Sequence, residues 1–132
     1  MTADIKTDAV KRNKRIVELL AKTRVNAKLA RILVFLSTVP EAVSRAIERE
    51  VNLRQPEVSV AMKELRELGW VDEKVDRTRG KGRPFKVYRL RKPLKDIVSE
   101  VVEKKRREIE RTEKKLEELE RLMGLIKQSE FA

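Results

Sequence analysis

At Gly69 the hydrophobic pattern of this sequence changes from a helical period to a two-residue period. The residues before it that follow helical spacing are Val58, Met62, Leu65 and Leu68. After it, residues 70–76 favour a strand, and residues 85–90 alternate so that Phe85, Val87 and Arg89 share one face. We therefore predict a helix over residues 55–68 that ends at Gly69, followed by a β-hairpin with a long tip.

Three segments upstream also have helical patterns. Residues 8–21 predict a short helix with a basic end, and residues 26–37 are apolar almost all round, as in a core helix. Pro40 is suited to the first position of another helix, because its missing N–H costs nothing there. Residues 52–55 form a short connection to the helix at 55–68. The apolar stripe expected after Pro40 is Val43, Ile47 and Val51.

The C-terminal segment predicts one long helix, opened by Pro93 and ended or frayed near Gly124. Its seam residues recur at alternating steps of three and four, as in a coiled coil. The expected dimer interface is Val98, Val102, Ile109, Leu116, Leu119, Met123 and Ile126, interrupted by the polar Lys105 and Thr112. The polar pair either sets the register or marks where the helices diverge. A second stripe of Leu94, Ile97 and Val101 is expected to pack on the preceding domain. We expect self-pairing, with a different partner protein as the alternative.

The positive charge is concentrated in one part of the chain. The sequence carries a formal net charge of +11, and residues 70–92 hold nine basic and three acidic residues, a net +6. By contrast, residues 93–132 hold ten of each. A cationic hairpin of this kind indicates a polyanionic partner more strongly than a basic composition does.

The composition also limits the kinds of metal and catalytic sites that the chain can form. With no Cys and no His, the chain has no thiolate metal site and lacks the usual neutral-pH acid–base group, so we expect no catalytic residues, metal or cofactor. No segment resembles a signal peptide or a membrane span, which predicts a cytoplasmic protein without membrane contact. Charged residues reach 42%, with abundant Lys, Arg and Glu, as in proteins from thermophiles.

Together these elements predict a mainly α fold with a small β-hairpin, organised as a winged helix-turn-helix domain and a long C-terminal coiled-coil helix. We expect an N-terminal basic helix or arm at 1–24, the DNA-binding domain at 25–92 and the dimerisation helix at 93–132. In such a domain the third helix, here the helix predicted at residues 55–68, enters the major groove, which is about 12 Å wide.

The outward residues of the third helix suit base contacts. Gln pairs with adenine, Lys with guanine, Glu with a cytosine amino group, and Val with a thymine methyl. Ordinary solvation of a polar helix face is the alternative. The residues expected to contact DNA from this helix are Arg54, Gln55, Glu57, Ser59, Val60 and Lys63.

The hairpin tip suits phosphate or minor-groove contact. Gly80 and Gly82 let its backbone approach closely. Trp70 and Tyr88 are expected to pack at the root of the hairpin, with stacking on exposed bases as the alternative. The expected wing contacts are Arg77, Arg79, Lys81, Arg83 and Lys86.

Residues 53–71 resemble the recognition segment of ArsR-type repressors and of archaeal regulators of the TrmB and Lrs14 kinds. These families share an L-x-Q-x-x-V-S-x-x-L-K-x-L-x-x-x-G-L-V pattern, matched here with Met62 and Trp70 in place of aliphatic residues. Gly-Lys-Gly-Arg-Pro at 80–84 is similar to their wings. The resemblance implies an archaeal transcriptional regulator that binds specific double-stranded DNA as a homodimer. The absence of Cys and His excludes thiolate metal sensing of the ArsR type, and we expect no sugar-binding domain like that of long TrmB proteins.

Two other functions fit the same pattern. The fold also serves as a protein-interaction module in transcription or replication assemblies, and as a nonspecific chromatin protein. A homodimeric regulator would present its two helices to half-sites about 34 Å apart. An enzyme is the least expected class, because no nucleophile–base pair is visible.

Overall fold

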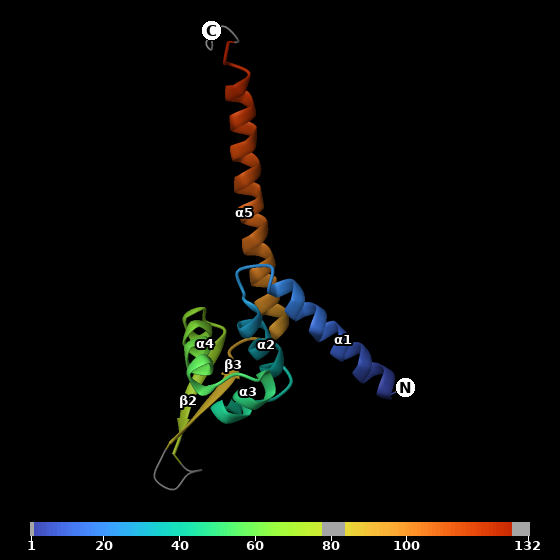
Figure 1. Cartoon of the computed structure of the whole chain (residues 1–132), viewed down its shortest axis with the longest axis vertical. Coiled ribbons are helices and arrows are strands. Elements are labelled where there is room, and N and C mark those ends of the chain that lie inside the picture. The colour runs from blue at the N-terminus through green and yellow to red at the C-terminus, as the bar shows by residue number, and fades with distance from the viewer. Residues whose placement is uncertain (1, 78–83, 128–132) are drawn as a thin grey trace. The chain divides into compact units, whose positions relative to one another are not determined.

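A computed structural model describes residues 2–77 and 84–127, with side chains from Thr7 onward (Figure 1). The expected wing residues Arg79, Lys81 and Arg83, with Gly80 and Gly82, lie outside the described residues. The chain divides into two compact units, Met1–Ile97 and Val98–Ala132. The elements in order are α1 (Thr2–Leu20), α2 (Ala27–Leu36), β1 (Ala42–Val43), α3 (Ser44–Val51), α4 (Gln55–Glu67), β2 (Val71–Asp76), β3 (Phe85–Leu90) and α5 (Leu94–Met123).

The core helix predicted at 26–37 is confirmed as α2. The side chain of Asn26 caps it by accepting a hydrogen bond from the Leu29 N–H at 3.0 Å. Helix α1 packs against α2 and begins at Thr2, six residues before the predicted start. Leu20 and Val25 are buried where the chain turns from α1 into α2. The C-terminal end of α1 therefore packs on the rest of the first unit.

The prediction of a helix starting at Pro40 is wrong. Ala42 and Val43 form the short strand β1, and α3 begins only at Ser44. Strand β1 pairs antiparallel with β3, so a ladder of hydrogen bonds replaces the first turn of the expected helix. A strand of two residues has no periodicity, and nothing in the local sequence distinguishes it. Two of the three expected stripe residues, Ile47 and Val51, are nevertheless buried on α3, whereas Val43 lies in β1 and is half-buried.

The sheet has three antiparallel strands in the order β1-β3-β2. The predicted hairpin is confirmed, with Val71 opposite Leu90 and Asp76 opposite Phe85. The strict alternation expected for β3 is only partly found, because the neighbours Val87 and Tyr88 are both buried. Strand β3 is central in the sheet, and side chains on both of its faces are covered.

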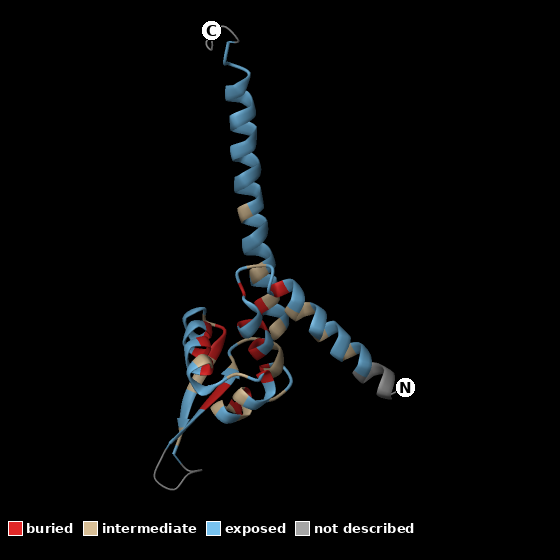
Figure 2. Ribbon diagram, viewed as in Figure 1, coloured by how far each residue is buried: buried red, intermediate tan, exposed pale blue. Residues whose placement is uncertain are grey.

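The core of the first unit lies between α2, α3, α4 and the sheet (Figure 2). Helix α4 contributes Val58, Met62 and Leu65, as predicted. Leu68 is wrong as a fourth core position, since 44% of it is exposed, and the small Ala61 is buried instead. The largest fully buried side chains of this core are Leu29, Ile32, Leu33, Leu36, Ile47, Val58, Met62, Leu65, Val71, Val87 and Ile97. The predicted mainly α fold with a small β-hairpin and a long C-terminal helix is confirmed, and β1 adds a third strand to the hairpin.

Helix α5 runs for 30 residues, and Figure 2 shows it exposed along most of its length. Ile97, in the first unit, is fully buried, as expected for the second stripe. The helix ends at Met123 with Gly124 following, so Ile126 lies beyond the helix and the predicted seam is one position too long. No helix among residues 2–77 and 84–127 is long and apolar enough to cross a membrane.

Candidate nucleic-acid interface

Helix α4 is held at both ends by local backbone geometry. Asn52 ends α3 in the left-handed conformation, with φ 52°, and turns the chain toward α4. Pro56 occupies the first turn, where no intrahelical N–H bond is lost. At the other end, the Trp70 N–H donates to the Leu65 carbonyl and the Gly69 N–H to the Arg66 carbonyl. This is a Schellman motif, and Gly69 supplies the positive φ of 80° that it needs.

The outward face of α4 holds the residues that the sequence predicts to contact bases. Gln55, Ser59 and Lys63 are exposed, and Val60 is 69% exposed on the same surface. The opposite face is buried against the rest of the unit. The structure therefore brings these four side chains together on one accessible surface, which combines hydrogen-bonding groups with one apolar contact.

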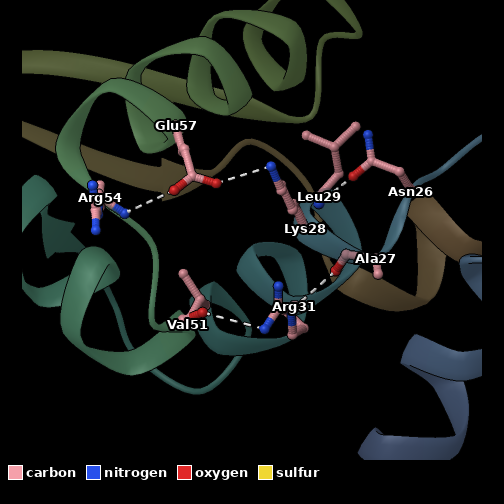
Figure 3. A network of polar contacts seen from close by, with 8 residues as sticks. All are labelled: Asn26, Ala27, Lys28, Leu29, Arg31, Val51, Arg54 and Glu57. Carbon is pink, nitrogen blue, oxygen red and sulfur yellow. Dashed lines mark hydrogen bonds and ion pairs between the residues drawn. The ribbon is translucent and has the colours of Figure 1, made fainter.

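The N-terminal end of α4 is tied to the start of α2 by a polar network (Figure 3). Lys28 Nζ lies 2.9 Å from Glu57 Oε2, and the Arg54 N–H donates to Glu57 Oε1 at 3.4 Å. These contacts lower the pKa of Glu57, first through the Lys28 side chain and then through the Arg54 N–H. Glu57, expected from the sequence to contact DNA, thus has both carboxylate oxygens engaged within the chain.

A second contact in the same network joins α2 to the end of α3. The Arg31 guanidinium donates to the Val51 carbonyl at 3.3 Å and to the Ala27 carbonyl at 3.4 Å. Val51 is the last residue of α3, so the bond satisfies a carbonyl that the helix leaves without an intrahelical donor. Together with the Lys28 contact, it holds the turn between α3 and α4 against α2.

Ion pairs at the root of the hairpin join its acidic residues to basic side chains of the hairpin and of α4. Arg91 Nε lies 2.8 Å from Asp72 Oδ1, and Arg66 donates to Glu73 at 3.2 Å. Lys86, an expected DNA contact on β3, is exposed and only 3.9 Å from Glu73. Arg77, at the end of β2, is exposed as well. Arg79, Lys81 and Arg83, which follow Arg77 in the sequence, lie outside the described residues.

The two aromatic residues of the hairpin are buried. Trp70 is 6% exposed and Tyr88 is 4% exposed, which confirms the prediction that they pack at its root. Burial, and then the neighbouring Glu73 carboxylate, raises the pKa of Tyr88 well above its ordinary value. Neither ring offers the exposed face that stacking on a base requires.

A shallow cleft lies between the start of α2 and the side of α4. Its volume is about 390 Å³, and it is mainly apolar, with Leu29, Pro56 and Val60 in its walls. Lys28 and Glu57 are at its edge. Sequence reasoning missed Lys28, because a contact between residues so far apart leaves no local signal. Among the described residues, no cluster of acidic side chains has the arrangement of a metal site.

Two packed helices, a tight turn, an exposed third helix and a basic hairpin define the winged helix-turn-helix class. Solved structures agree. The chain aligns with TrmBL2, an archaeal chromatin protein, at 25% identity and a TM-score of 0.56, over 88% of this chain and 43% of the other. It therefore spans less than half the length of that protein.

Two further structures support the fold alone. A MarR family transcriptional regulator from Silicibacter pomeroyi DSS aligns at 15% identity, with a TM-score of 0.52, over 96% of this chain and 90% of the other. RV1404 from Mycobacterium tuberculosis aligns at 20% identity, with a TM-score of 0.50, over 84% and 79%. No family model and no curated protein matches the sequence. Together with TrmBL2, these structures confirm the predicted resemblance to winged helix-turn-helix proteins.

Proposed function

We propose that this protein is a transcriptional regulator that binds double-stranded DNA, with α4 in the major groove and the basic hairpin on phosphates or in the minor groove. The observation that carries the proposal is the exposed face of α4, on which Gln55, Ser59, Val60 and Lys63 lie together. These side chains match the donor, acceptor and methyl groups of base edges. The likeness to TrmBL2, whose structure concerns DNA binding, supports the DNA-binding part of the proposal.

Within this proposal, Glu57 orients the helix and does not contact a base. Its carboxylate is neutralised by Lys28 and hydrogen-bonded to the start of α4, so a negative group close to the DNA is tolerated. We propose that Arg54, which is exposed at the N-terminus of the helix, contacts a phosphate.

The wing is tested by reversing the charge of Arg79, Lys81 and Arg83 to Glu. We expect retention of a duplex in a gel-shift assay to be lost. A matched control reverses Arg107, Lys114 and Arg121 on the C-terminal helix, which changes the net charge by the same amount and should leave binding largely intact. Equal binding by both triple variants would show that these wing residues do not contact DNA.

We further propose that the protein acts as a homodimer through α5. Its seam residues remain exposed in the single chain, including 48% of Leu116 and 62% of Leu119. Apolar side chains repeated at coiled-coil spacing need a partner to leave water. Sedimentation equilibrium of the full chain tests this, and a monomer at all concentrations would rule it out.

Nonspecific chromatin binding is the second candidate, favoured by the likeness to an archaeal chromatin protein. The two candidates differ in sequence preference. Selection of bound duplexes from a random pool should yield a palindromic consensus for a dimeric regulator, whereas a chromatin protein would bind unrelated duplexes with equal affinity.

A further inference from the structure

The apolar seam of α5 has two kinds of position in the coiled-coil heptad. Val102, Ile109, Leu116 and Met123 occupy position a, and Val98, Lys105, Thr112 and Leu119 occupy position d. About half of the surface of Val102 and Ile109 is exposed in the single chain. The following inference rests on the proposed homodimer and concerns how its two α5 helices pair.

A parallel pair in register conflicts with this sequence. Identical positions face each other in such a pair, so Lys105 would lie against Lys105 of the second copy inside the seam. The flanking positions are mixed. Position g of one heptad lies beside position e of the next heptad in the partner, which puts Glu108 against Glu113 of the second copy and Lys115 against Glu120 of the second copy. The Lys105 contact and the Glu108–Glu113 contact are between like charges, and only the Lys115–Glu120 contact is attractive.

We propose that α5 pairs antiparallel with α5 of a second copy, in the register that places Val102 opposite Leu119. The same register sets Ile109 opposite Thr112 and Lys105 opposite Leu116. Every layer then has an apolar side chain from at least one helix, and no two lysines meet in the seam.

The polar seam residues are compatible with this arrangement. The Thr112 hydroxyl donates to the Glu108 carbonyl at 3.0 Å, so it needs no partner in the other helix. Lys105 Nζ lies 3.4 Å from Glu108 Oε2, at the edge of the seam. The lysine stem can therefore cover Leu116 of the second copy while its ammonium stays at the rim.

The flanking charges specify the register. In this alignment Arg106 lies beside Glu113 of the second copy, and Glu108 lies beside Lys115 of the second copy, each pair occurring twice by symmetry. The apolar Val101 lies beside Leu122 of the second copy. Sliding the helices by one heptad brings Glu113 and Lys115 each against its own copy. Sliding them the other way does the same to Arg106 and Glu108, so only one register has attractive charges throughout.

Charge reversal at Glu113 separates the two orientations by the sign of its effect. Antiparallel pairing predicts that Glu113→Arg weakens the dimer about tenfold, because two attractive contacts with Arg106 become repulsive. Within its own helix the new arginine attracts Glu110 and Glu117, which Glu113 repels. The substitution therefore does not destabilise the helix, and helix loss does not explain the weaker dimer. The double variant Arg106→Glu/Glu113→Arg should restore wild-type dimerisation, and Glu117→Arg, off the seam, is the matched control. A tighter Glu113→Arg dimer would instead show parallel pairing, because repulsion from Glu108 is removed.

Disulfide trapping gives an independent measurement, because the chain contains no cysteine. Val102→Cys and Leu119→Cys should not cross-link on their own, since like positions lie about 26 Å apart along an antiparallel pair. An equal mixture of the two variants should cross-link, because a disulfide needs Cα atoms about 4.4–6.8 Å apart. Cross-linking of each variant alone would overturn the proposal.

Failure of this inference is distinguishable from failure of the proposed function. If the wild-type chain is dimeric but cross-links in the parallel pattern, only the orientation is wrong. If it is monomeric throughout, both the inference and the proposed homodimer fail. Duplex binding in a gel shift reports on α4 and the wing separately, and its loss in the wing variant does not depend on how α5 pairs.

Discussion

Lys28 and Glu57 form an ion pair, 2.9 Å between Nζ and Oε2, that joins the first turn of α2 to the first turn of α4. The second Glu57 oxygen accepts the Arg54 N–H, so one carboxylate both caps α4 and fixes it to its neighbour. A negative side chain is favourable at a helix N-terminus because the helix dipole is positive there. The pair thus stabilises the end of α4 that is proposed to approach DNA.

The first prediction concerns pH. The folded-state pKa of Glu57 is lowered from 4.5, so the stability it contributes is present above 4.5 and is lost as pH falls through the lowered value. Glu57→Gln should therefore be less stable than wild type near neutral pH, and the difference should shrink in acid. Thermal melting of both proteins between pH 6 and pH 3 measures this. Glu64→Gln, an exposed position on the same helix, is the control, and a pH-independent difference for Glu57→Gln would contradict the assignment.

The second prediction separates base contact from phosphate contact. Lys63→Ala should relax base preference at one position of the selected consensus and cost about 1–3 kcal/mol on the preferred duplex. Lys86→Ala should weaken binding to all duplexes alike and reduce the salt slope by about one ion. Fluorescence anisotropy at several salt concentrations distinguishes the two. Identical losses on every duplex for Lys63→Ala would argue against its contact with a base.

A third prediction compares two leucines on α4. Leu65 is fully buried, so Leu65→Ala should cost about 2–5 kcal/mol through lost apolar contact and a residual cavity. Leu68 is 44% exposed, and Leu68→Ala should cost much less, in the range of about 0.5–1 kcal/mol. Denaturant unfolding of the two variants measures the difference. Equal destabilisation would mean that Leu68 belongs to the core after all.

The fourth prediction concerns the end of α4. Gly69 has φ 80°, a conformation that costs an L-residue about 1–2 kcal/mol, so Gly69→Ala should destabilise the protein by roughly that amount. Its Cβ would meet only the Arg91 side chain at 3.7 Å, which makes backbone strain the cause. Gly124→Ala is the matched control, because that glycine has no positive φ and an added Cβ would lie 3.4 Å from the Arg121 carbonyl. A neutral Gly69→Ala would contradict the Schellman geometry.

Much of the candidate interface could be predicted from local patterns. The bounds of α4 follow from the stripe beginning at Val58, from Pro56 in the first turn and from Gly69 at the end, because each acts within a few residues of itself. The outward position of Ser59 and Lys63 then follows from the helical period. Their contact with DNA stays a prediction, as does that of the wing residues.

The long-range contacts could not be predicted in this way. Whether Ala61 or Leu68 is buried depends on how the other elements pack around α4. The helical period alone predicted that Leu68 is buried. Ile126 continued the seam by spacing, yet the helix ends at Met123. In both cases the sequence pattern extends beyond the point where packing or the helix itself stops.

The change of period at Gly69, the basic hairpin and the seam of α5 are determined by the sequence itself, because capping, strand alternation and heptad spacing are short-range properties of the chain. Only the tertiary structure decided that Ala42 and Val43 form a strand, because their hydrogen-bonding partners lie on β3, more than forty residues away. It likewise decided that Lys28 neutralises Glu57. An interaction between distant segments depends on the folded arrangement that brings them together, and no local pattern records it.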